Sequence, residues 1–265
     1  MSGTLLKREI KASYKMLLIF LAVLAMYAAM IVAMYDPKLG ESLNMMAASM
    51  PEIFAAFGML NVGSTLLEFV SNYLYGFLLV VFPLVFIIML ANRLVARYVD
   101  RGSMAYLLAT PVSRARLIFT QVFVLLAQVL FMVLFVVGLI IGLCEAMFAG
   151  QLEMQSFLLL NAGLLGLLVF LAGINFFTSC VFNDTRSSYS VGAGLCIAFV
   201  LVQMVSQVGD KFAFLKYATP LTLFDAAGLC SGSMEALIGM GMLYLGGLLL
   251  LGLGMVIFCK KDMPV

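Results

Sequence analysis

The sequence predicts an all-α integral membrane protein with six transmembrane helices, and its composition, its apolar runs and the placement of its cations all predict it. Of the 265 residues, 65% are hydrophobic and 11% are charged, and the mean hydropathy is +1.16. Soluble domains are about half apolar and a quarter charged. A bilayer core of about 30 Å takes about 20 apolar residues per helix. Residues 1–265 therefore accommodate six crossings in a single transmembrane domain.

Each expected span is an apolar run bounded by polar or helix-breaking residues. We expect the spans over residues 16–35, 73–92, 117–144, 157–182, 189–208 and 236–259. Pro83 is expected to kink the second span, because proline removes one intrahelical hydrogen bond. Residues 183–186 predict a tight turn between the fourth and fifth spans. Pro51 and Glu52 predict the start of a helix reaching Leu60, which is too short to cross and is placed at the outer surface or as a re-entrant segment.

The distribution of cations predicts the orientation. With the N-terminus inside, the three outer cations are Lys38, Lys211 and Lys216. The inner segments hold the other twelve: Lys7, Arg8, Lys11, Lys15, Arg93, Arg97, Arg101, Arg114, Arg116, Arg186, Lys260 and Lys261. Positive residues are retained on the cytoplasmic side, so both ends are expected in the cytoplasm.

Residues 7–15 precede the first span and carry four cations and one acid. Leu6, Ile10 and Tyr14 are spaced four apart and form an apolar stripe beside this basic face. That pattern predicts an amphipathic helix lying in the membrane interface and leading into the first span. A simple basic flank is the alternative.

Several classes of chemistry are excluded by residues that the chain lacks. It has no histidine, which excludes Ser-His and Cys-His catalysis and His-ligated zinc. It has no G-x-x-x-x-G-K-[ST] motif, so it should not hydrolyse ATP itself. No charge lies in the middle of a span, which argues against a proton- or ion-coupled transporter and against an intramembrane enzyme. We therefore expect no catalytic residue, cofactor or metal in this chain. The five cysteines are scattered, and whether Cys144 and Cys230 pair near the outer face is left open.

Uncharged polar residues remain within the spans. They are Gln121, Gln128, Asn161, Asn175, Gln203 and Gln207. They could bond one helix to another or line a translocation path. Ser190, Gly194 and Ala198 form a small-residue stripe that predicts close packing on another helix, of this subunit or of a partner. The glycines of the last span, Gly252 among them, are interpreted as packing positions.

Residues 93–116, which we call the inner loop, are the most informative stretch. They hold five arginines and one aspartate. Gly102 is expected to end one helical extension, Ser103 to cap a short helix over residues 104–109, and Pro111 to start the next helix. The short helix would present apolar side chains rimmed by arginines to the cytoplasm, as a docking surface for a soluble partner. An ordinary basic loop embedded in lipid headgroups is the alternative.

At this loop the sequence resembles the type-2 permeases of ATP-binding-cassette (ABC) transporters. That family shows the pattern G-[ST]-L-E-x-L-L-x-x-P-[VI]-[ST]-R between its second and third helices, and residues 102–114 read GSMAYLLATPVSR. The sequence departs at Ala105, where the family has an acid, and at Tyr98-Val99, where the family has an acidic run. The resemblance covers essentially the whole chain, although only the loop motif is specific.

The resemblance implies a permease subunit of an exporter in the cell membrane, as in a bacterial plasma membrane. The subunit would form the path in a homodimer or heterodimer, and cytosolic ATPase subunits would supply ATP and Mg²⁺. The loop would act as a coupling helix in a groove of the ATPase, and the implied coupling residues are Arg101, Gly102, Ser103, Met104, Tyr106, Leu107, Leu108, Pro111 and Arg114. The alternative is a membrane component without a motor, such as a channel, scaffold or assembly factor. No nucleic-acid partner is expected.

Overall fold

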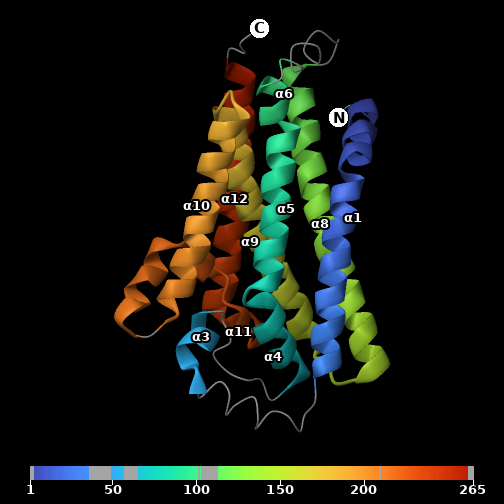
Figure 1. The fold of residues 1–265 in the computed structure, drawn as a ribbon, viewed down its shortest axis with the longest axis vertical. Helices are drawn as coiled ribbons and strands as arrows, with labels where there is room; N and C mark the ends of the chain where they lie inside the picture. The colour runs from blue at the N-terminus through green and yellow to red at the C-terminus, as the bar shows by residue number, and fades with distance from the viewer. Residues whose placement is uncertain are drawn as a thin grey trace.

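The structure is a computed structural model that describes residues 3–35, 49–56, 65–100, 102, 113–208 and 210–261. Within these residues the protein is all-helical, and six helices are long and apolar enough to cross a membrane. The predicted fold class is therefore confirmed. The long helices stand side by side in one upright bundle, and both termini lie at the same end (Figure 1).

Six helical runs make up the bundle, and shorter helices lie between them. The runs are α1 (Gly3–Met34), α4 to α6 with α5 (Leu78–Leu94) at its centre, α8 (Arg114–Met147), α9 (Met154–Val181), α10 (Thr185–Ser206) and α12 (Met234–Lys260). The shorter elements are α3 (Pro51–Ala56), α4 (Leu66–Val70), the π-helix η1 (Ser71–Tyr75), α6 (Ala96–Asp100), the 3₁₀ helices η2 (Asp210–Ala218) and η3 (Pro220–Leu223), and α11 (Ala226–Cys230).

Each run overlaps its predicted span and begins earlier in the sequence, because the residues that start the helices lie in polar flanks. Ser113 accepts a hydrogen bond from the backbone N–H of Arg116 at the start of α8. Asp184 and Ser233 cap α10 and α12 in the same way. Such side chains satisfy backbone donors that a helix start leaves unpaired. The predicted turn at residues 183–186 is present, and α3 begins at Pro51 as predicted.

The second run is interrupted where the sequence did not indicate it. The π-helix η1 ends at a turn formed by Gly76 and Phe77, and Phe77 lies outside the helical region with φ −142° and ψ −53°. A second break falls at Val95, between α5 and α6. Helix α5 continues through Pro83 without ending there, and the kink expected at this residue stays a prediction. One missing hydrogen bond is tolerated in a membrane helix when neighbouring groups satisfy the freed carbonyl.

The predicted N-terminal helix is the beginning of α1 rather than a separate element. No glycine or proline interrupts the sequence between Thr4 and Met34, so the helix continues without a break. Leu5, Glu9 and Ser13 face the bundle and are buried. In the predicted apolar stripe, Ile10 and Tyr14 are exposed and Leu6 is half-buried. Its location at the membrane interface stays a prediction.

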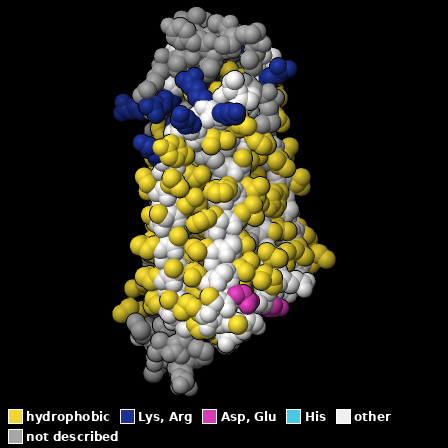
Figure 2. All heavy atoms as spheres, turned by 90° about the vertical axis from the view of Figure 1, so that its right-hand side faces the viewer, with side chains coloured by type: hydrophobic (Ala, Val, Ile, Leu, Met, Phe, Trp, Pro, Cys, Tyr) yellow, Lys and Arg dark blue, Asp and Glu magenta, His cyan; other side chains and the backbone are white. Residues whose placement is uncertain are grey.

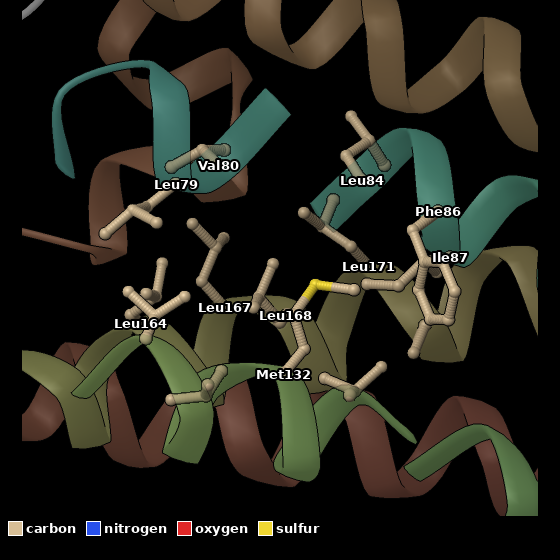
Figure 3. Packing of buried hydrophobic residues seen from close by; sticks show 14 of the residues in the cluster. Leu79, Val80, Leu84, Phe86, Ile87, Met132, Leu164, Leu167, Leu168 and Leu171 are labelled. Carbon is tan, nitrogen blue, oxygen red and sulfur yellow. The ribbon is translucent and has the colours of Figure 1, made fainter. Parts of the chain in front are cut away.

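The core lies around α9, which packs against α5, α8, α10 and α12. Figure 3 shows leucines of α9 between the side chains of α5 and α8. The labelled residues are Leu164, Leu167, Leu168 and Leu171 of α9, Leu79, Val80, Leu84, Phe86 and Ile87 of α5, and Met132 of α8. Helix α9 is therefore the central helix of the subunit.

The backbones of α9 and α12 touch. A Cβ atom added to Gly247 would lie 2.8 Å from the backbone nitrogen of Phe170, and one added to Gly173 would lie 2.7 Å from the carbonyl oxygen of Gly247. Small residues allow this approach between membrane helices. Gly252 is different, because a Cβ there would meet nothing within 4 Å. The interpretation of Gly252 as a packing position was wrong.

Basic and acidic residues lie toward opposite ends of the bundle. On the face shown in Figure 2, lysine and arginine gather at the upper end, acidic residues lie near the lower end, and a hydrophobic belt lies between them. We call the upper end, where the termini lie, the basic end. This arrangement agrees with the cation bias of the sequence. That the basic end is cytoplasmic stays a prediction.

Candidate functional site: the base of the inner loop

The middle of the inner loop lies outside the described residues. This applies to Arg101, Ser103, Met104, Tyr106, Leu107, Leu108 and Pro111. The structure does place Gly102 and Arg114, one on each arm of the loop. We use "descending arm" for α6 with Gly102, and "ascending arm" for the start of α8 from Ser113.

Gly102 ends the descending arm as predicted. Its φ is +66°, a left-handed conformation that glycine adopts without strain, and its N–H donates to the carbonyl of Val99 at 3.0 Å. A left-handed glycine is a common way to end a helix.

The descending arm is attached to two other helices. The Tyr98 hydroxyl donates to Glu9 Oε1 of α1 at 2.5 Å, and the Arg8 guanidinium lies 6.0 Å from the centre of the Tyr98 ring. Thr185 Oγ1, in the first turn of α10, donates to Asp100 Oδ2 at 2.9 Å. The arm that enters the loop is thus bonded to both α1 and α10.

The ascending arm is attached to the end of α12. Arg114 donates from its guanidinium to the backbone carbonyl of Lys261 at 3.1 Å. The Lys261 ammonium in turn donates to the carbonyls of Val181 and Cys180 at the end of α9. A cation is favourable at a helix C-terminus, where unpaired carbonyls carry partial negative charge. Burial lowers the pKa of Lys261 from its usual value.

Glu9 is the functional candidate that the sequence reasoning missed. It is 1% exposed, although from the sequence it was counted only as the one acid among the four cations of residues 7–15. A carboxylate is costly to bury unless it is hydrogen-bonded, and Tyr98 supplies that bond. The signal that could have found it is the i, i+4 spacing of Leu5, Glu9 and Ser13, which places them on one helix face.

Three of the predicted polar residues bond one helix to another. Gln128 Nε2 donates to Ser13 Oγ at 2.8 Å and joins α8 to α1. The Tyr75 hydroxyl donates to Asn161 Oδ1 at 2.8 Å and joins η1 to α9. Asn175 is the third residue, and its Nδ2 lies 3.2 Å from the sulfur of Cys196 on α10. This geometry favours interhelix bonding for these three.

The other three polar residues are not brought into such bonds. Gln121 is fully buried, and neither its amide oxygen nor its amide nitrogen meets a hydrogen-bond partner among the described residues. The Gln203 amide oxygen likewise lacks a partner in that part of the chain, and Gln207 is the half-buried C-cap of α10. A role for any of the six in lining a path stays a prediction.

The small-residue stripe of α10 faces away from the subunit. Ser190, Gly194 and Ala198 are exposed, and a Cβ on Gly194 would meet nothing within 4 Å. The neighbouring face of α10 packs instead, because a Cβ on Gly192 would lie 2.6 Å from Thr178 Oγ1 of α9. No helix of the described residues covers the stripe. Cys144 and Cys230 are free thiols in this structure.

No curated protein and no solved structure matches the chain. A family model does, and it matches residues 4–263, almost the entire length. Its description is "ABC-2 family transporter protein", a family of membrane subunits that are distinct from the ATPase. The match agrees with the six membrane helices and with the resemblance carried by residues 102–114. The chain therefore belongs to the ABC-2 transporter family and is a multi-pass permease subunit of an ABC transporter.

Proposed function

We propose that this subunit forms the translocation path of an exporter in a dimer, and that a separate cytosolic ATPase drives it through the inner loop. The observation that supports this proposal is that both arms of the inner loop are hydrogen-bonded to other helices. Its descending arm is bonded to α1 and α10, and its ascending arm to the C-terminal end of α12. A force applied to the loop would therefore act on several membrane helices at once, as switching between inward- and outward-facing states requires.

The exposed face of α10 supports the dimer. Ser190, Gly194 and Ala198 leave a surface on which another helix backbone could approach closely. Without water in the bilayer, such small-residue faces are the common sites of helix association. A second permease subunit, identical or different, is the proposed occupant.

The proposal extends to the class of cargo. The chain contains 22 phenylalanines and 10 tyrosines, and its spans are uncharged in the middle. A path between spans of this composition would favour an amphipathic or hydrophobic substrate over a small ion, because an ion is costly to desolvate without a charged or polar partner.

The test is to purify the tagged chain with its bound proteins in mild detergent and to measure ATP hydrolysis by the complex. Wild type should retain an ABC-type ATPase. Leu107→Asp or Leu108→Asp should weaken retention of the ATPase and leave membrane insertion intact, because a buried unpaired carboxylate in an apolar groove is strongly unfavourable. Leu107→Met keeps the apolar surface and is the matched control.

Two results would count against the proposal. If wild type retains no ATPase, the alternative of a membrane component without a motor is favoured. If the aspartate variants retain the ATPase and its activity at the level of Leu107→Met, the inner loop is not the coupling element.

A further inference from the structure

Four residues link three helices by hydrogen bonds that run from the basic end into the bundle, with the backbone of Glu9 as one of the links. Tyr98 of α6 donates to the Glu9 carboxylate of α1. One turn further along α1, the Ser13 hydroxyl donates to the backbone carbonyl of Glu9 at 2.8 Å. Gln128 of α8 donates to that hydroxyl at 2.8 Å. We call these residues the four-residue network.

Through α1, these bonds connect the descending arm of the inner loop to α8, the helix that leaves the loop. Tyr98 lies on the arm that enters the loop. Gln128 lies on the helix that leaves it, 14 positions after Arg114, which is about 21 Å along the helix at 1.5 Å per residue. The buried face of the first turns of α1 therefore contacts the loop at its base and its outgoing helix well inside the bundle.

Burial gives these bonds their strength. Glu9 and Ser13 are each 1% exposed, and Gln128 is 5% exposed. Away from water, a carboxylate that loses its donor has no solvent to replace it. The Tyr98–Glu9 bond is part-buried, since its acceptor is buried and its donor is half-buried, and it ties α6 to α1 more firmly than a fully exposed contact would.

We infer that Glu9 and Tyr98 are positioning residues that make the N-terminal turns of α1 move together with the inner loop. This rests on the proposed function, since it concerns how motion received by the loop reaches the membrane helices. In this arrangement, a displacement of the inner loop moves α1 directly through the Tyr98–Glu9 bond at the basic end. The displacement does not have to pass through the other helices of the bundle first.

The experiment uses the permease with its copurified ATPase in lipid nanodiscs and measures hydrogen exchange of the backbone amides of residues 5–13, without nucleotide and with ATP and vanadate. Tyr98→Phe removes the donor, and Glu9→Leu removes the acceptor. Glu9→Gln retains an oxygen that accepts the Tyr98 bond and is the conservative rescue. Tyr14→Phe is the matched control, because Tyr14 is exposed on the same helix.

Wild type should show a nucleotide-dependent change in exchange over residues 5–13. In Tyr98→Phe and Glu9→Leu, exchange without nucleotide should be faster by about tenfold or more, the factor expected for losing a hydrogen bond to a charged group. The nucleotide response should also be lost in these two variants. Glu9→Gln and Tyr14→Phe should respond like wild type.

A purely structural bond would raise exchange and leave the nucleotide response unchanged, and that result would overturn the inference. A complex that hydrolyses ATP but shows no response at residues 5–13 in wild type would also overturn it, while the proposed function would stand. If no ATPase copurifies with wild type, the proposed function fails and the inference fails with it.

Discussion

Substitution of Gly247 by alanine tests whether the backbone contact between α9 and α12 holds the subunit together. The added methyl group would lie 2.8 Å from backbone atoms of both Val169 and Phe170. Backbone atoms inside a helix cannot rotate away as a side chain can, so the two helices must separate. Gly252→Ala is the matched control, because it lies on the same helix and its methyl group would meet nothing within 4 Å.

The two variants should differ in the free energy of unfolding in opposite directions. Overpacking a closely packed core costs about 1–3 kcal/mol. Gly252→Ala has no clash and gains helix propensity of up to about 1 kcal/mol. Because Gly247→Ala gains the same helix propensity, the expected separation between the variants is the overpacking cost of about 1–3 kcal/mol, which corresponds to about 2–12 °C in the melting temperature.

Thermal unfolding in detergent, followed by the loss of helical circular dichroism or by the fraction remaining monodisperse after heating, measures this difference. Gly247→Ala should melt well below wild type, and Gly252→Ala at or above it. Equal melting temperatures for the two variants would refute the reasoning, because they would show that α9 and α12 do not approach as closely as the structure places them.

Two further predictions concern single hydrogen bonds. Tyr75→Phe should lower the free energy of unfolding, because Asn161 loses its donor. The expected loss is about 0.6 kcal/mol and no more than about 1.7 kcal/mol, the range measured for interhelix bonds in membranes. Tyr217→Phe, at an 85% exposed site, is the control and should leave the thermal unfolding unchanged. Asp184→Ala should lower the melting temperature and Asp184→Asn should largely preserve it, since both Asp and Asn can accept from the backbone N–H of Ser187. That hydrogen bond lowers the pKa of Asp184 below its usual value of 3.8. The ionised carboxylate therefore contributes to the stability of the fold above pH 3.8, and this contribution is lost as the pH falls through the lowered pKa. If the melting temperature of Asp184→Ala stays equally far below that of wild type at the lowest pH, the reasoning is contradicted.

The spans could be predicted because each depends on a local property, the length of an apolar run. Their starting residues could not be placed as well, since capping residues such as Ser113 and Asp184 lie in the polar flanks that a hydropathy argument assigns to loops. The break in the second run escaped prediction for a different reason. From the sequence, only the missing donor of Pro83 was considered, whereas the interruption occurs at Gly76 and Phe77, and a glycine in a membrane helix does not by itself indicate a break.

The site was predictable only in part. The motif over residues 102–114 was readable as a pattern, and the end of the helix at Gly102 followed from glycine's access to positive φ. The bond between Glu9 and Tyr98 joins residues 89 positions apart. No local rule pairs two such residues, and only the packing of α1 against α8 and α5 brings them together.

The two helical runs that meet at the inner loop are mechanically unequal. Helix α8 is a single element of 34 residues, a stiff rod of about 51 Å at 1.5 Å per residue. The opposite run is jointed, at Val95 and again at Gly76 and Phe77. A displacement of the loop would reach the far side of the membrane undiminished along α8, while the jointed run would absorb it within its inner section. The outer ends of the helices would then be repositioned chiefly by the tilt of α8.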